Sequence, residues 1–135
     1  NLRGTFLAVK AAETRMADGA SIVIYTSTAG QRGSSFFSAY ATAKGGQILF
    51  MRSMCQELAP RRIRVNCIAP SWTETEMSGA KMDGIGREKI LAGCPLGRIG
   101  QPDDVAGATI FLLSDLAKFI TGTTVTVDGA IDMRG

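Results

Sequence analysis

The chain has 135 residues, of which 45% are apolar and 20% charged, and its formal net charge is +3. This length is sufficient for one small domain with a modest core and too short for two. The sequence contains no histidine, which excludes a Ser-His-Asp triad and any site built on imidazole ligands.

The three cysteines, Cys55, Cys67 and Cys94, form no CxxC pair. An odd and sparse set favours a reducing compartment over a disulfide framework or a structural zinc, so no metal site is predicted. No apolar run approaches the roughly 18 residues of a membrane span, and no signal peptide opens the chain. We therefore predict a cytoplasmic protein without a membrane partner. The basic cluster at 61–64 is interpreted as a solvated helix terminus, so nucleic-acid binding is not predicted.

Apolar periodicity predicts a helix over residues 1–17 and a strand over 20–26. The strand holds the apolar run Ile22-Val23-Ile24, which suits a strand buried on both faces, as in a parallel sheet. Residues 27–38 are rich in glycine and serine and are predicted to form a loop, and a second helix is predicted over 39–59.

The second half of the chain continues the alternation. A strand is predicted over 63–69 and closes at Pro70, and a helix starts at Pro102 and leads to a last strand over 123–127. The intervening segment, 71–100, is long and glycine-rich, with a short helix predicted at about 87–91. A connection of this length is usually functional and often forms a lid.

The predicted order αβαβαβ, with short connections, indicates an α/β layered fold with a parallel sheet and right-handed crossovers. Three strands make a narrow sheet, and the first helix has no preceding cap. We therefore interpret the chain as a fragment or an incompletely represented protein.

Tyr40 and Lys44 are four residues apart, which places both on one face of the predicted helix. A phenol with a pKa near 10 is a poor acid–base group at neutral pH. A cation about 4 Å away favours the phenolate by roughly 4 kcal/mol at an effective dielectric near 20, so Lys44 would make Tyr40 a usable proton donor and acceptor. Ser27 follows the first strand directly, at the end where parallel α/β folds place ligands. The spacing alone is weak, because a half-buried tyrosine beside an exposed lysine is also a common structural arrangement.

Motifs along almost the whole chain strengthen this interpretation. They are NLRGTF (1–6), GASIVIYTS (19–27), YATAK (40–44), RVNCIAP (64–70), GRIGQPDDVA (97–106) and ITGTTVTVDG (120–129). In this order they resemble the carboxyl-terminal half of a short-chain dehydrogenase/reductase.

The resemblance implies a Rossmann-like, doubly wound parallel sheet, of which residues 1–135 form the carboxyl-terminal part of a single NAD(P)-binding domain. It implies an NAD(P)-dependent oxidoreductase that interconverts a secondary alcohol and a ketone by hydride transfer. Tyr40 would transfer the proton, Lys44 would assist it and bind the nicotinamide ribose, and Ser27 would hold the substrate oxygen. Asn1 would support a water in the proton relay. Cofactor contacts are implied for Tyr40, Lys44, Pro70, Thr73 and Thr75.

Two features depart from the family pattern. Ser71 follows the strand-ending proline where the family usually has glycine, which bears on the fit of the nicotinamide. The glycine-rich turn that grips the dinucleotide phosphates belongs to an amino-terminal half that this sequence does not contain. Gly84-Ile85-Gly86 follows no strand and is no substitute. The sequence therefore does not decide between NAD and NADP.

Phe36, Phe37 and Trp72 flank the expected reacting centre and are interpreted either as walls of a substrate pocket or as local core. The resemblance implies a small-molecule carbonyl or alcohol substrate, such as a 3-oxoacyl thioester, a sugar or a polyol. It also implies a homotetramer formed through helices 1–17 and 39–59. Two alternatives remain: a non-catalytic scaffold or binding protein with the same fold, and a fragment that is inactive by itself.

Overall fold

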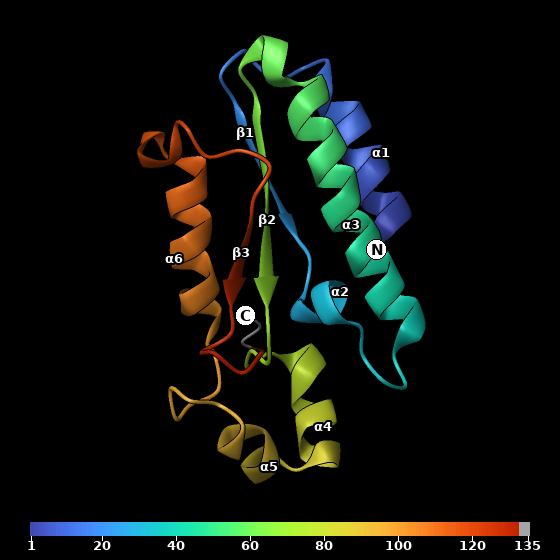
Figure 1. Cartoon of the computed structure of the whole chain (residues 1–135), viewed down its shortest axis with the longest axis vertical. Coiled ribbons are helices and arrows are strands. Elements are labelled where there is room, and N and C mark those ends of the chain that lie inside the picture. The colour runs from blue at the N-terminus through green and yellow to red at the C-terminus, as the bar shows by residue number, and fades with distance from the viewer. Residues whose placement is uncertain (133–135) are drawn as a thin grey trace.

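The computed structural model describes residues 1–132, which form a three-stranded parallel sheet (Figure 1). The strands β1 (Ser21–Tyr25), β2 (Arg64–Pro70) and β3 (Thr124–Val127) lie side by side in this order. The register pairs Ser21 with Arg64 and Cys67 with Thr124. All three strands therefore end at the same edge of the sheet. The predicted α/β fold with a parallel sheet is confirmed.

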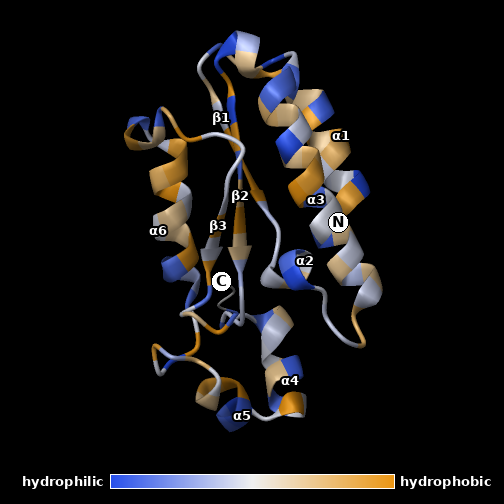
Figure 2. Cartoon of the chain, viewed as in Figure 1, coloured by the Kyte–Doolittle hydropathy of each residue, from blue (hydrophilic) through white to orange (hydrophobic). Residues whose placement is uncertain are grey.

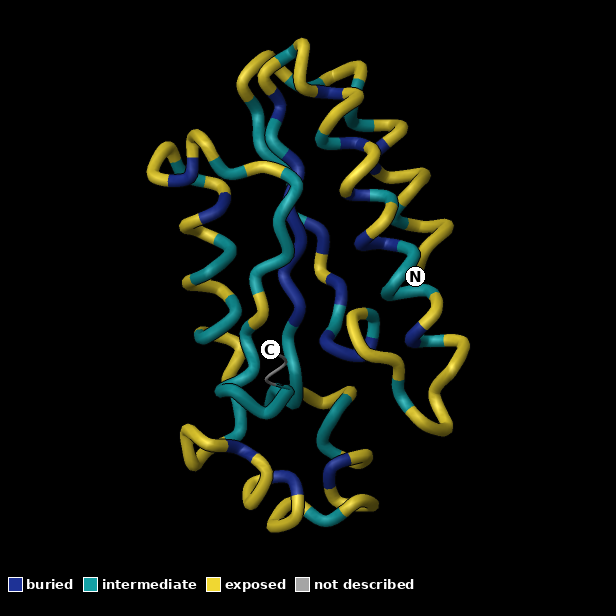
Figure 3. The backbone as a smooth tube through the Cα atoms, viewed as in Figure 1, coloured by how far each residue is buried: buried dark blue, intermediate teal, exposed yellow. Residues whose placement is uncertain are grey.

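Helices cover both faces of the sheet (Figure 1). The helices α1 (Leu2–Glu13) and α3 (Ser38–Glu57) lie on one face, and α6 (Pro102–Leu113) lies on the other. Alternate residues of β2 serve the two cores, because successive side chains of a strand point to opposite faces. Val65 and Cys67 pack with α1 and α3, whereas Ile68 packs with Leu112 of α6. Figure 3 shows β2 as the buried centre of this three-layer arrangement.

Each α helix that flanks the sheet is fixed by specific contacts. Phe6 of α1 meets Phe50 of α3 edge-to-face, with ring centroids 5.9 Å apart.

The basic cluster at 61–64, predicted to be a solvated helix terminus, also makes hydrogen bonds within the protein. Arg64 donates to the carbonyl oxygens of Leu112 (2.6 Å) and Ser114 (3.2 Å), at the carboxyl end of α6. Cations at this end of a helix satisfy free carbonyls and oppose the helix dipole.

The two crossovers have opposite hands. The β1–β2 connection carries α3 on one face and is right-handed, as predicted. The β2–β3 connection carries α6 on the other face while the strand order continues in the same direction. The prediction of right-handed crossovers is therefore wrong for this second connection. In this connection the chain forms other helices beyond the sheet edge before it reaches α6. The rule of right-handed crossovers assumes a helix that directly follows a strand, and α6 does not.

Several boundaries differ from those predicted. The first helix ends at Glu13, and the predicted 27–38 loop contains the helix α2 (Thr28–Arg32). The 71–100 segment holds α4 (Glu76–Ile85) as well as the expected short helix, α5 (Arg87–Ala92). Both new helices are glycine-containing and lack strong periodicity, so local capping decides them: Ser27 caps α2, and Thr75 with Ser78 forms a capping box on α4. Short 3₁₀ turns occur at Ala59–Arg61 and Asp115–Ala117.

The start of α6 is fixed by a bidentate ion pair. Arg98 donates to both carboxylate oxygens of Asp104, at 2.6 and 2.7 Å, and the Gln101 amide donates to the same carboxylate at 2.7 Å. These hydrogen bonds, that from Arg98 first, hold the pKa of Asp104 well below its ordinary value. Because the folded state favours the carboxylate, its stabilisation is present above about pH 4 and is lost as the pH falls through the folded pKa.

Asp104→Asn is therefore expected to lower the Tm at pH 7 by about 2–4 °C and to matter less in acid. Thermal melts of the variant and the wild type at pH 7, 4 and 2 measure the difference. Asp103→Asn, in the same helical turn, is the matched control and is expected to change the Tm by less. A Tm difference for Asp104→Asn that is as large at pH 2 as at pH 7 would contradict the expectation.

Candidate functional site at the carboxyl edge of the sheet

Ser27 lies two residues beyond the end of β1 and caps α2. Its backbone is extended, and its Oγ accepts a hydrogen bond from the Ala29 amide at 3.2 Å. The cap uses the oxygen of the hydroxyl as an acceptor, so the hydroxyl proton can still be donated to a ligand. The prediction that Ser27 stands at the carboxyl end of a strand is confirmed.

Tyr40 and Lys44 lie on one face of α3, as predicted. The Lys44 ammonium is 5.7 Å from the centroid of the Tyr40 ring, and it donates a 2.8 Å hydrogen bond to the carbonyl oxygen of Tyr25, the last residue of β1. Lys44 thus joins the Tyr40 ring to the strand end that delivers Ser27. Tyr40 and Lys44 are both half-buried.

The electrostatics of Lys44 follow from its position. Partial burial lowers the pKa of Lys44, because removing water disfavours the charged ammonium. Cys67, which lies on β2, acts in the opposite direction on Lys44 only when its thiol is ionised. Burial also raises the pKa of Cys67 to about 12, so this thiol is neutral at physiological pH. Burial is therefore the main influence on the pKa of Lys44.

A close backbone contact sets the position of α2 against α3. A Cβ placed on Gly30 would lie 2.6 Å from the carbonyl carbon of Lys44 and 2.8 Å from the Gly45 nitrogen. Beside this contact, the buried Thr26 hydroxyl donates to the Lys44 carbonyl at 2.7 Å. Two independent contacts therefore hold the backbone of Lys44 against the segment that carries Ser27. No sequence signal marks Gly30 or Thr26, because their partner is 14 to 18 residues further along the chain.

Asn1 stands at the start of α1. Its side chain makes no capping hydrogen bond, and its carbonyl oxygen accepts from the Thr5 amide at 3.1 Å. Leu2 lies against Gly46, where an added Cβ would be 2.7 Å from the Leu2 Cδ2 atom. The start of α1 is therefore next to the turn of α3 that follows Lys44. In the part of the chain that the structure describes, no hydrogen bond links the Asn1 side chain to Ser27, Tyr40 or Lys44.

The turn after β2 carries the predicted cofactor residues. Pro70 ends β2, the Ser71 amide donates to Val127 at 3.1 Å, and Thr73 forms a parallel bridge with Gly100. The Thr75 hydroxyl lies 2.8 Å from the Ser78 hydroxyl within the capping box of α4. Thr75 thus has a structural task, capping α4, beside its predicted contact with the cofactor.

The three predicted pocket aromatics occupy different places. Phe37 precedes α3 and is exposed, and the Lys81 ammonium of α4 lies 5.2 Å from its ring centroid. Trp72 instead lines a separate hollow of about 210 Å³ with Leu96, Arg98 and Gly129. Phe37 therefore lies beside α4, whereas Trp72 lies near Asp128 and Gly129, which follow β3. Phe36 is fully exposed.

The predicted lid segment is a helical pair, held together by one arginine. Arg87 donates to both oxygens of Glu74 at 2.7 and 2.8 Å and to Asp83 at 2.5 Å. The hydrogen bond from Arg87 lowers the pKa of the Glu74 carboxyl. The pair α4–α5 is therefore tied back to the turn that follows β2.

Two classes of feature are absent from residues 1–132. In this part of the chain, no group of three or more cysteine and carboxylate side chains lies close enough together to hold a metal ion. Among the same residues, no helix combines the length and the apolar character that a bilayer crossing requires.

Comparison with known proteins identifies the arrangement. A family model described as Enoyl-(Acyl carrier protein) reductase matches residues 1–131. The 3-oxoacyl-[acyl-carrier-protein] reductase FabG of Chlamydia trachomatis is 41% identical over 110 residues, which are 82% of this chain and 44% of that protein. The chain belongs to the short-chain dehydrogenase/reductase family. It spans about half the length of the curated relatives that it matches.

Solved structures agree with this assignment. A short-chain dehydrogenase/reductase from Brucella melitensis, described as a glucose/ribitol dehydrogenase, aligns over 98% of this chain and 54% of its own, with 34% identity and a TM-score of 0.93. A blue fluorescent protein from a metagenomic library, solved in complex with NADPH, aligns over 96% of this chain and 52% of its own, with 29% identity and a TM-score of 0.89. The Rossmann-like fold of this short-chain dehydrogenase/reductase is thus shared along nearly its whole length.

Proposed function

We propose that the full-length protein is an NAD(P)-dependent oxidoreductase that interconverts a secondary alcohol and a ketone, with Tyr40 as its acid–base group. The single observation that carries the proposal is the placement of the Lys44 ammonium between the Tyr40 ring and the carbonyl oxygen at the end of β1. Lys44 so placed would bind the nicotinamide ribose beside Tyr40, and the Tyr40 hydroxyl would give and take the proton of the substrate oxygen. Ser27, on the same strand end, would donate its hydroxyl proton to the substrate oxygen.

The residues present fit the nicotinamide end of the cofactor. An ammonium has three protons, and the Tyr25 carbonyl takes one of those on Lys44, so two remain for ribose hydroxyls. Pro70 ends β2, and Thr73 and Thr75 follow it on the next turn, where they would contact the carboxamide and pyrophosphate region of the nucleotide. The nicotinamide nucleotide, NAD or NADP, would supply or accept the hydride when bound. Asn1 would hold a water of the proton relay at the start of α1.

The other end of the cofactor would be held by a further part of the protein. Within residues 1–132, β1 leads into a helix of five residues, which is too short for the phosphate-binding turn and helix of a dinucleotide site. We therefore propose that residues 1–135 are the carboxyl-terminal part of a single dinucleotide-binding domain and are inactive by themselves.

The substrate and the assembly are part of the same proposal. Relatives described as 3-oxoacyl-[acyl-carrier-protein] reductases support a 3-oxoacyl thioester as the substrate, with sugars or polyols second. Phe37, which precedes α3 and lies beside Lys81 of α4, would contact the substrate, with Trp72 as the second predicted contact. The exposed apolar side chains Phe6, Leu7 and Leu49 on α1 and α3 support a homo-oligomer, a tetramer by resemblance, formed through these helices. Free cysteines support a cytoplasmic location.

Steady-state assays of the full-length protein test the proposal. NADH and NADPH oxidation would be measured with a short 3-oxoacyl thioester and with a panel of ketoses, and reduction of NAD⁺ and NADP⁺ with sugars and polyols. Turnover with the thioester is expected. Turnover with sugars alone would keep the reaction class and change the substrate. No turnover with any pair would contradict the proposal and favour a non-catalytic scaffold.

A further inference from the structure

The helix α2 is short and polar, so apolar packing does little to fix its position. It has five residues, of which only Thr28 and Ala29 are buried. Its end carries Gln31 and Arg32, and Figure 2 shows this end as hydrophilic. A helix of this length is not stable by itself in water. Because Ser27 caps α2, the position of the Ser27 hydroxyl depends on the contacts that hold this helix.

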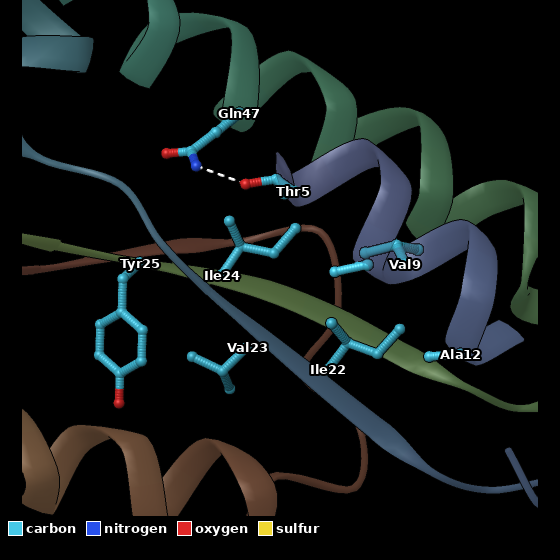
Figure 4. Close-up of a pocket in the computed structure, with 9 residues that line it drawn as sticks. Thr5, Val9, Ala12, Ile22, Val23, Ile24, Tyr25 and Gln47 are labelled. Atoms are coloured by element: carbon cyan, nitrogen blue, oxygen red, sulfur yellow. Dashed lines mark hydrogen bonds between the residues drawn. The ribbon is translucent and has the colours of Figure 1, made fainter. Parts of the chain in front are cut away.

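The strand that leads to Ser27 is fixed independently of α2. The Tyr25 side chain points toward α6, as Figure 4 shows, and its hydroxyl lies 2.8 Å from that of Thr109. The Thr26 amide donates to the carbonyl oxygen of Ile68 on β2 at 2.8 Å. The remaining freedom of Ser27 is therefore that of the helix on its other side.

Two side chains at the end of α2 reach the last strand and the segment that follows it. The Gln31 Nε2 atom donates to the Thr126 hydroxyl of β3 at 3.1 Å, in an exposed position. Arg32, the last residue of α2, donates from Nε to the Asp132 carboxylate at 2.7 Å. The Asp132 side chain is only 9% exposed. Loss of one partner from such an ion pair is costly, because it leaves a charge buried and unpaired.

Asp132 is itself held in a turn. The Asp128 carboxylate, directly after β3, accepts from the Ala130 amide at 2.9 Å and from the Asp132 amide at 3.0 Å. One carboxylate oxygen of Asp132 receives Arg32, and the other, Oδ2, is buried without a hydrogen-bond partner among residues 1–132. Within these residues Arg32 is thus the cation that compensates the Asp132 charge. The turn in return gives α2 a rigid attachment.

We propose that Arg32 and Asp132 are positioning residues, whose ion pair holds α2 so that the Ser27 hydroxyl meets the substrate oxygen. The contact of Gly30 with the backbone of α3 sets how closely α2 approaches Lys44, and the ion pair fixes the far end of the same helix. The inference rests on the proposed role of Ser27, whereas the ion pair and the cap can be tested without it.

Kinetics of the full-length protein test the inference. Arg32→Met is expected to lower kcat by about 5- to 30-fold and to keep the Kd of the nicotinamide nucleotide within about twofold, because it displaces a group that contacts only the substrate. In a Ser27→Ala background the same substitution is expected to change kcat by less than about twofold, since no hydroxyl is left to misplace. Equal losses in the two backgrounds, or no loss in the wild-type background, would overturn the inference.

Two further variants are controls for the charge and for the site. Arg32→Lys keeps the cation and is expected to retain at least about a third of the wild-type kcat. Arg15→Met makes the same substitution at an exposed arginine outside the candidate site and is expected to leave kcat unchanged. A loss of kcat in Arg15→Met, or one in Arg32→Lys as large as in Arg32→Met, would contradict the role assigned to the ion pair.

Hydrogen exchange separates this inference from the proposed activity. The Ala29 amide donates to the Ser27 Oγ atom, so its protection reports on the cap even in a protein that turns over no substrate. In Arg32→Met this amide is expected to exchange at least about tenfold faster than in the wild type, with the Thr26 amide unchanged as internal control. An unchanged rate at Ala29 would overturn the inference. Faster exchange in a protein without turnover would support the positioning of Ser27 and contradict only the proposed function.

Discussion

Replacing Tyr40 with phenylalanine in the full-length protein is expected to lower kcat/KM by about 10²- to 10⁴-fold, the usual contribution of a positioned acid–base group. The substitution removes only the phenol oxygen. The ring that the Lys44 ammonium faces at 5.7 Å remains, and so does the hydrogen bond from Lys44 to the Tyr25 carbonyl. Binding of the nicotinamide nucleotide, measured by fluorescence titration, is therefore expected to change by less than about tenfold.

The second tyrosine of the chain provides a matched control. The hydroxyl of Tyr25 lies 2.8 Å from that of Thr109 on α6, away from Lys44, and only the backbone carbonyl of Tyr25 contacts the candidate site. Tyr25→Phe is expected to keep kcat/KM within about threefold of the wild type. If Tyr40→Phe retained full turnover, or if both variants lost activity equally, the assignment of Tyr40 as the acid–base group would be wrong.

Replacing Gly30 with alanine is expected to destabilise the protein by about 1–3 kcal/mol, the usual cost of overpacking. The added Cβ would meet backbone atoms at 2.6 and 2.8 Å, and backbone cannot rotate away as a flexible side chain can. α2 must therefore move from α3, which separates Ser27 from Lys44. We expect a lower midpoint of urea unfolding and, in the full-length protein, a lower kcat.

Gly107→Ala is the control for this substitution. Gly107 lies within α6, where an added Cβ would meet nothing within 4 Å. Alanine has the higher helix propensity, so this variant is expected to gain up to about 1 kcal/mol. Equal unfolding midpoints for Gly30→Ala and the wild type would show that α2 and α3 are not held together by this contact.

The elements with strong patterns were predictable, and so was part of the candidate site. The apolar run Ile22-Val23-Ile24 identified a strand that packs against a core on each face, although only Ile24 of it is fully buried in the described residues. The spacing of Tyr40 and Lys44 placed them on one helix face. Ser27 was placed at a strand end because the predicted strand, residues 20–26, ends just before it. Each of these inferences uses residues that are close in the sequence.

Features that depend on long-range contacts were not predictable. The hydrogen bond from Lys44 to the Tyr25 carbonyl, and the contact of Gly30 with the backbone of α3, exist only because strand and helix pack in three dimensions. The short helix α2 depends on a cap at Ser27, and a composition rich in glycine and serine favours a loop over it. The second crossover follows no local signal at all.

The strand β3 and the segment that follows it are fastened to the helix that Ser27 caps. Gln31 of α2 donates to the Thr126 hydroxyl at 3.1 Å, and Arg32 pairs with Asp132 at 2.7 Å, contacts that span about 100 residues of sequence. On the ribosome, Ser27 and Tyr40 emerge long before Thr126 and Asp132 are synthesised. The surroundings of Ser27 are therefore completed only after Thr126 and Asp132 have been synthesised, and chains released before that point lack these two contacts.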